Sequence, residues 1–354
     1  MHYTFREKGG AYFNDMIRKA VDNGEHSCTI TGNWEIEEAI KVPSDFALIL
    51  DGCHLRMKDG VISNMFVNEH INCLSPLVKD YDIIIEGRGR AILDGGEPNG
   101  LNERTLKADP SAFPGVTHTA VNSILMFAHV DGIRISGLQI RNQRYWALAF
   151  AYCCHGVIGN IDFRSNDTWI DASGQLRHGF VRRETKLEGI RVRTADGIDL
   201  RCGCHDFIIE NITGFTEDDT MALNCVWCNV AETYYAQGDS KDIWNVIIRN
   251  INTASRCSLL RLLNGDGNHL HDILIDGVFD ALRECRFTNI SNFFVRIGDI
   301  KPYYRETPSK PGEVYNITVK NVHSIGKKPP LKVECVVSNL VLDQICSDWN
   351  WRDN

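Results

Sequence analysis

The chain has 354 residues and a formal net charge of −8, and its acidic and basic residues are mixed along its length. It has no basic stripe that would follow a phosphate backbone, so we do not expect nucleic acid as a partner. No segment forms the uninterrupted apolar run that a signal peptide or a membrane span needs, which predicts a soluble, cytoplasmic protein with no membrane partner.

The cysteines are numerous and scattered. There are 13 of them, an odd number, and they lack the spacing of a zinc ribbon or of a redox motif. We therefore expect buried free thiols, no bound metal and no cofactor.

The N-terminal segment has the pattern of a short helix. Phe13, Ile17 and Val21 recur at helical spacing, Asn14 is expected near the start, and Asn23-Gly24 is expected to end the helix. Residues 1–45 are therefore expected to form a cap, because the exposed terminal strand of a repetitive fold would otherwise invite aggregation.

A short phrase recurs along the rest of the chain: an apolar, β-branched run, one polar residue, Gly or Asn, and another apolar residue. Gly or Asn is favoured because the chain turns sharply there, and these residues tolerate left-handed backbone angles. Gly137 and Asn160 are 23 residues apart, as are Asn321 and Gln344. The nine copies begin at Leu48, Ile83, Ile133, Val157, Phe207, Val246, Ile273, Ile317 and Leu340.

A strand-rich repeat of this length, without amphipathic helices between its copies, predicts an all-β fold. We expect a right-handed parallel β-helix with a short N-terminal helical cap, in which each coil buries its apolar side chains by stacking on its neighbours. Because no linker divides the chain, residues 1–354 are expected to form a single domain. Leucine-rich repeats are the nearest alternative, but their fixed Leu-x-x-Leu-x-Leu frame is absent.

Two neighbouring coils carry carboxylates where ordinary solvent-facing residues would suffice. Asp218 and Asp219 follow Asp196 by 22 and 23 residues, about one coil. Residues one coil apart stack at about 4.8 Å, so the three carboxyls are expected on one surface. Crowded carboxylates raise one another's pKa, which lets one stay protonated while its neighbours are ionised.

These motifs resemble those of the polygalacturonase-like glycoside hydrolases (glycoside hydrolase family 28-like, of the pectin lyase-like parallel β-helix class). Thr194-Ala195-Asp196-Gly197 is similar to the family's Asn-Thr-Asp-Gly, and Glu217-Asp218-Asp219 to its Gly-Asp-Asp, with every aspartate kept. Leu93-Asp94-Gly95-Gly96 and Asn142-Gln143-Arg144-Tyr145-Trp146 resemble its Ile-Asp-Gly-x-Gly and Asn-x-Pro-x-Trp segments.

The resemblance implies an inverting glycosidase that acts on a short oligosaccharide or glycoside. It implies Asp218 as the general acid, and Asp196 and Asp219 as the carboxylates that activate water. The acid and base carboxyls of inverting enzymes lie about 6.5–9.5 Å apart. The sugar, the linkage and the oligomeric state are left open.

Two family positions differ in this chain. Gly-His-Gly is replaced by Ser255-Arg256-Cys257-Ser258, and Arg-Ile-Lys by Arg296-Ile297-Gly298. In the family this His-Arg-Lys group contacts the sugar and its carboxylate, so we expect weak activity on galacturonate polymers. Arg296 is retained as a candidate substrate-binding residue.

Three further substrate-binding candidates each have a second, structural interpretation. Arg261 lies in an apolar run and is either a sugar contact or a solvent-facing strand residue. Asp199 either binds sugar or ends a strand. Trp146 offers a ring for sugar stacking or is a buried aromatic residue.

Two other functions remain open. A polysaccharide lyase or epimerase on the same scaffold abstracts a proton beside a uronate carboxylate and usually needs Ca²⁺ or a basic residue. A non-catalytic carbohydrate-binding β-helix is the other. Extra residues at 169–188 and 226–241 are expected to form loops beside the site, where they favour short substrates.

Overall fold

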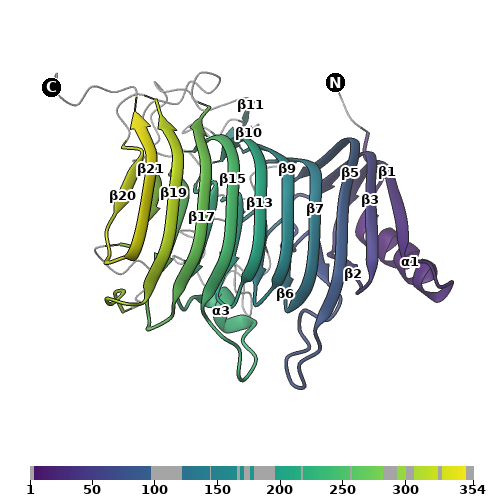
Figure 1. Ribbon diagram of the computed structural model, residues 1–354. Helices are drawn as coiled ribbons and strands as arrows, with labels where there is room; N and C mark the ends of the chain where they lie inside the picture. The colour runs from purple at the N-terminus through teal and green to yellow at the C-terminus, as the bar shows by residue number, and fades with distance from the viewer. Residues whose placement is uncertain are drawn as a thin grey trace.

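The fold is a right-handed parallel β-helix, in agreement with the repeat (Figure 1). The computed structural model describes residues 4–96, 122–143, 145–165, 168–170, 176–178, 196–216, 218–255, 257–281, 293–299, 307–325 and 329–347. Along the chain, successive strands pass alternately into a ten-stranded and a nine-stranded parallel sheet, so the neighbours of each strand belong to the adjacent coils.

The ten-stranded sheet contains, in order, β1 (Ser27–Ile36), β3 (Phe46–Met57), β5 (Asp80–Asp94), β7 (Val130–Arg141), β9 (Cys154–Arg164), β13 (His205–Thr216), β15 (Ile243–Ser255), β17 (Leu270–Asp280), β19 (Val314–Ser324) and β21 (Ser338–Ser347). The nine-stranded sheet contains β2 (Ile40–Val42), β4 (Phe66–Asn68), β6 (Leu125–Ala128), β8 (Leu148–Ala151), β12 (Ile198–Arg201), β14 (Met221–Cys225), β16 (Ser258–Asn264), β18 (Phe293–Ile297) and β20 (Leu331–Val333). The remaining elements are the antiparallel pair β10 (Thr168–Ile170) and β11 (Leu176–His178), and the helices α1 (Gly9–Asp22) and α3 (Asn229–Thr233).

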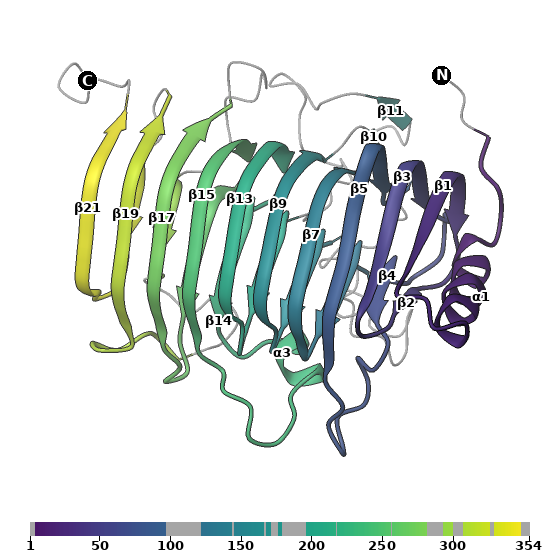
Figure 2. The same ribbon diagram turned by 45° about the vertical axis from the view of Figure 1, so that its right-hand side comes forward.

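Helix α1 covers the N-terminal end of the coil stack (Figure 2). It packs against β1 and β2, the first strands of the two sheets. Phe13, Ile17 and Ala20 are buried in the main core. The strands β1 and β2 lie within residues 1–45, and both already belong to the sheets.

The helix ends at Asp22, as predicted, but it begins at Gly9, before Asn14. A Cβ atom at Gly9 would lie 2.7 Å from Ile36 Cδ1, so glycine lets the first turn lie close to β1. Val21 is 47% exposed, so its expected place on the apolar face is wrong. No helix in the described ranges is long and apolar enough to pass through a lipid bilayer.

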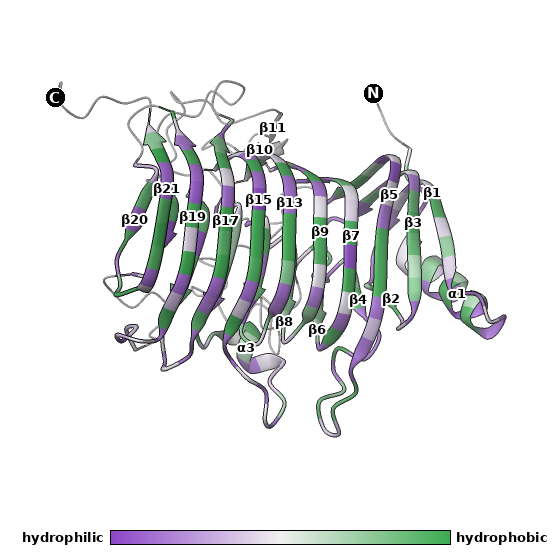
Figure 3. Ribbon diagram, in the orientation of Figure 1, coloured by the Kyte–Doolittle hydropathy of each residue, from purple (hydrophilic) through white to green (hydrophobic). Residues whose placement is uncertain are grey.

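The main core lies between the two sheets. In β13, Phe207, Ile209 and Ile212 are buried in the core, while Ile208 and Glu210 are partly exposed. Figure 3 shows this alternation of hydrophobic and hydrophilic residues along strand after strand. Each core residue packs on its counterpart in the next coil, because the sheets are parallel and mostly in register.

The Gly or Asn of the repeated phrase bends its strand rather than ending it. Asn211 and Asn250 have φ of 56° within β13 and β15, so the predicted left-handed backbone is confirmed there. Asn250 Nδ2 also donates a hydrogen bond of 2.5 Å to Asn211 Oδ1 in the neighbouring coil. In β5 the positive φ falls at Gly89 instead of Gly87, because the pairing register shifts in that strand.

Candidate active site

The three predicted acids lie at the start of two neighbouring strands of the nine-stranded sheet. Asp196 precedes β12, and Asp218 and Asp219 precede β14. The two strands pair in parallel, and the Gly197 N–H donates a 2.9 Å hydrogen bond to the carbonyl oxygen of Asp219. Asp219, 23 residues after Asp196, is therefore the residue directly one coil on, and Asp218 lies beside it.

Hydrogen bonds fix the Asp218-Asp219 turn from the next coil. The carbonyl oxygen of Asp218 accepts bonds from Thr216 Oγ1 at 2.9 Å and Ser255 Oγ at 2.6 Å. Asp218 Oδ1 accepts the N–H of Asp219 at 3.0 Å. Asp219 Oδ1 accepts the N–H of Ser258 at 2.8 Å. Both carboxyls are thus held in place by the backbone around them.

Burial and mutual repulsion raise the pKa values of these carboxyls. Asp196 is 6% exposed, and burial, followed by the charges of Asp199, Asp218 and Asp219, raises its pKa well above the ordinary value. Burial, reinforced by the charge of Asp219, raises the pKa of Asp218 to about 7. Because each charge acts on the others, the acids form one electrostatically coupled group.

A buried arginine lies beside Asp199. Arg201 Nη2 is 2.9 Å from Asp199 Oδ1, and both side chains are fully buried. Burial raises the pKa of Asp199 to about 7, against the lowering effect of the Arg201 charge. The Arg201 guanidinium carbon also lies 3.5 Å from the centroid of the Trp146 ring. The sequence pattern did not indicate this arginine.

Trp146 is 3% exposed, and Arg201 covers one face of its ring. An aromatic side chain needs an open face to stack on a sugar. The structure therefore favours the buried-aromatic interpretation of Trp146 and corrects the prediction that it binds substrate by stacking.

Asp199, Arg261 and Arg296 lie in one row across the outer face of the nine-stranded sheet. The strand registers pair Asp199 with Ala222, Ala222 with Arg261, Arg261 with Arg296, and Arg296 with Lys332. Residues on either side of the row, including Leu200 and Leu262, point into the core. The outer face is therefore acidic near β12 and carries three basic side chains from β16 to β20.

Carboxylates neutralise much of this basic end. Arg261 donates to Asp299 at 2.7 Å, and Arg296 donates to Asp299 at 2.8 Å and to Glu334 at 2.6 Å. Lys332 lies 2.7 Å from Glu334. The charge of Arg261 also lowers the pKa of Asp218, so the row reaches the acids.

A thiol stands where the family's histidine would be. Cys257 Sγ lies within 4.8 Å of carboxylate oxygens of Asp218 and Asp219, an arrangement with ligand atoms for a cation. Burial, followed by the charges of Asp219 and Asp218, raises the pKa of the Cys257 thiol above its ordinary value. The sequence marked Cys257 only as the place of a missing histidine. Its contact with the acids depends on the fold.

The segment 226–241, which contains α3, lies over the outer face of the nine-stranded sheet. Val230, Ala231 and Tyr234 pack in a second apolar cluster with Ala149 and Trp146. This segment therefore borders the Asp199 row. Most of the other expected loop, residues 169–188, lies outside the described residues. So do five residues of the motifs, namely Arg144, Thr194, Ala195, Glu217 and Arg256.

Comparison with known proteins gives a likeness of fold. No family model matches the chain, and no curated protein matches it. The chain is similar to an exopolygalacturonase from Thermotoga maritima, with a TM-score of 0.58, 14% identity, and coverage of 98% of this chain and 90% of that chain. The fold is shared.

Two further solved structures show the range of chemistry on this fold. The A-module of a mannuronan C-5 epimerase from Azotobacter vinelandii has a TM-score of 0.57 and 11% identity, and the match covers 95% of this chain and 72% of that chain. A polygalacturonase from Erwinia carotovora ssp. carotovora has a TM-score of 0.52 and 14% identity, with coverage of 98% and 95%. At these identities the likeness concerns the fold, and the chemistry is argued from the site.

Proposed function

We propose that the chain is a glycoside hydrolase that cleaves a short oligosaccharide or glycoside with inversion. The proposal rests mainly on the coupled carboxyls of Asp196, Asp218 and Asp219, among which the pKa of Asp218 is raised to about 7. The resemblance of the aspartate motifs supports it, as does the fold likeness to two polygalacturonases.

Asp218 serves as the general acid. It is partly exposed, whereas Asp196 and Asp219 are buried, and its raised pKa keeps a proton available near neutral pH. That proton passes to the glycosidic oxygen as the bond to the anomeric carbon breaks. The leaving group then departs as a neutral alcohol.

Asp219 and Asp196 hold the attacking water on the opposite face of the sugar. Asp219 takes the proton of the water as its oxygen bonds to the anomeric carbon, which completes the inversion. Asp196 has the more strongly raised pKa, so it positions the water by hydrogen bonding rather than by carrying a full negative charge.

The substrate-binding surface favours a sugar without a carboxylate. Arg261 and Arg296 share Asp299, and Glu334 pairs with Arg296 and Lys332. A uronate would have to compete with these carboxylates, and the family's lysine is Gly298 in this chain. We therefore retain Arg261 and Arg296 as contacts for sugar hydroxyls, and Asp199 as a support for Asp196.

The test is a screen of oligosaccharides and aryl glycosides from plant and microbial sources, with Asp218→Asn as the matched inactive control. NMR of the first product formed should show the anomer opposite to that of the substrate. Retention of the anomer would contradict the proposal. An unsaturated or epimerised product that requires Ca²⁺ would favour a lyase or epimerase, and binding without turnover would favour a carbohydrate-binding β-helix.

A further inference from the structure

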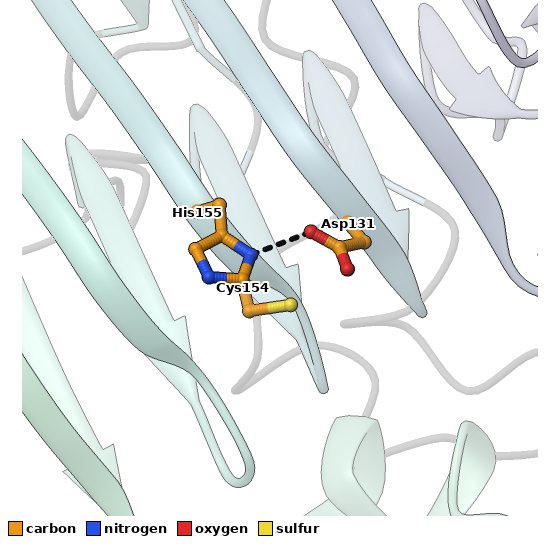
Figure 4. A group of neighbouring side chains, drawn as sticks. All are labelled: Asp131, Cys154 and His155. Carbon is orange, nitrogen blue, oxygen red and sulfur yellow. Dashed lines mark hydrogen bonds and ion pairs between the residues drawn. The ribbon is translucent and has the colours of Figure 1, made fainter.

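A second group of ligand-type side chains lies on the ten-stranded sheet, away from the aspartates. Asp131 of β7 pairs in register with Cys154 of β9, and His155 follows Cys154 in the chain. Figure 4 shows the three side chains turned toward one another. One carboxylate oxygen, the thiol sulfur and one imidazole nitrogen all lie within 4.8 Å of each other.

We propose that Asp131, Cys154 and His155 bind a zinc ion or a transition-metal cation of similar ligand preference. The set offers one sulfur, one nitrogen and one oxygen donor, which are the three ligand types that zinc takes from proteins. Calcium and magnesium prefer oxygen donors alone, so the thiol and the imidazole disfavour them. Three protein ligands leave the fourth tetrahedral position to water or an exogenous ligand.

The backbone at His155 explains why adjacent residues converge on one point. Successive side chains of a regular strand point to opposite faces of the sheet. His155 has a φ of 53°, a left-handed conformation that is uncommon outside glycine. This breaks the alternation and brings its Nδ1 to 2.6 Å from Asp131 Oδ1, on the side where Cys154 Sγ lies.

A second carboxylate lies behind the imidazole. Asp206 Oδ2 is 3.9 Å from His155 Nε2, the ring nitrogen that does not face Asp131. Histidine ligands usually give their second ring N–H to a carboxylate, a carbonyl or water, which fixes the ring for metal binding. Asp206 begins the next coil, in β13, so the arrangement draws on three consecutive coils.

Metal binding exchanges existing contacts for bonds to the cation. The Cys154 thiol releases its proton to solvent, and the hydrogen bond between His155 and Asp131 is replaced by metal–nitrogen and metal–oxygen bonds. The cation then links β7 to β9 on their outer face. A link that forms only in the folded chain stabilises it in proportion to the binding.

The test uses the full chain, kept reduced and stripped of metal by a chelator, and titrates it with Co²⁺ and Zn²⁺. We expect one bound cation, a thiolate-to-cobalt charge-transfer absorption band, and a melting temperature that rises with Zn²⁺. Cys154→Ser should abolish the band, and His155→Asn should weaken binding. Both should remove the rise in melting temperature. Circular dichroism without metal verifies that each variant is folded.

Matched controls come from the same molecule. His26→Asn removes an exposed imidazole that lies 2.9 Å from Asp45, and Cys73→Ser removes an exposed thiol. Both variants should bind as the parent chain does. The proposal is overturned if the parent shows neither band nor stabilisation, or if the band survives Cys154→Ser and disappears in Cys257→Ser, which would place the cation beside Asp218.

Discussion

Asp218 is the partly exposed member of the coupled carboxyl group, and its replacement separates proton donation from water activation. Asp218→Asn should lower turnover of substrates with poor leaving groups by about 10²- to 10⁴-fold, the usual contribution of general acid catalysis. An activated aryl glycoside should lose much less, because its leaving group departs without a proton. Asp219→Asn should slow both substrates alike.

The measurement is a comparison of kcat for the two substrate types in each variant. Asp343→Asn is a suitable control, since it makes the same change at an exposed position of β21. Near-normal turnover of the natural substrate by Asp218→Asn, or a trapped covalent glycosyl-enzyme, would rule out the inverting assignment.

The same residue predicts the alkaline limit of activity. Because the pKa of Asp218 is raised to about 7, the acid form predominates below that pH, and kcat/KM for a poor leaving group should fall as the pH rises through it. Asp218→Asn should lack this limb when assayed with an activated glycoside. A pH profile that is flat across neutrality in the parent chain would contradict the assignment.

Asp299 is expected to determine whether the site accepts acidic sugars. It bridges Arg261 and Arg296, so Asp299→Asn removes one negative charge between two guanidinium groups. A charged hydrogen bond contributes about 1.5–3 kcal/mol, so kcat/KM for galacturonate oligomers relative to neutral ones should rise about tenfold or more.

Asp276→Asn is the control for Asp299→Asn, since it breaks an ion pair of 3.1 Å with Lys320 on the other sheet. The predicted weak activity on polygalacturonate belongs to the same test. Efficient release of galacturonate by the parent chain would refute both.

At the scale of the element, α1 is expected to stabilise the end of the coil stack. Ile17 is 4% exposed, and its truncation to Ala should lower the free energy of unfolding by about 2–5 kcal/mol. Val21→Ala, on the solvent side of the same helix at 47% exposure, should change it by about 0.5 kcal/mol or less. Urea denaturation of both variants measures the difference, and equal losses would show that α1 does not act through its apolar face.

The elements themselves were accessible to sequence reasoning where a local rule governs them. The Asn of the repeated phrase marks a left-handed bend because few other residues adopt that conformation, and it fixed the length of a coil. That length placed Asp196 against Asp219. Gly9 was missed as the start of α1 because its role depends on close contact with Ile36, which no local pattern encodes.

Contacts across the outer face were not accessible in the same way. Arg201 reads as an ordinary residue near a strand end, and only the fold brings it onto Trp146, 55 residues earlier in the chain. Asp299 and Glu334 follow their strands in sequence, but their pairing with arginines of neighbouring coils depends on register. Cys154 and Asp131 are 23 residues apart, one coil, yet their spacing matches no linear metal motif.

At the scale of the whole molecule, the two proposed sites lie on different sheets and should be separable. Removal of metal by a chelator should lower the melting temperature, because the Asp131 group belongs to the ten-stranded sheet. It should leave hydrolysis unchanged, because the proposed chemistry uses carboxyls and water at the nine-stranded sheet. Turnover and thermal unfolding measured on one chelated sample test this, and loss of turnover would favour cation-dependent lyase or epimerase chemistry.

The coil that carries segment 226–241 has a consequence for how such a protein changes over evolutionary time. Asp219 and Ser258 occupy equivalent places 39 residues apart, while Asp196 and Asp219 are 23 apart, yet the strands on both sides stay paired one to one. The corner between β14 and β15 thus absorbs extra chain without disturbing its neighbours. Descendants of one ancestor can therefore exchange diets by lengthening or trimming a corner, while the inherited acids continue the same reaction.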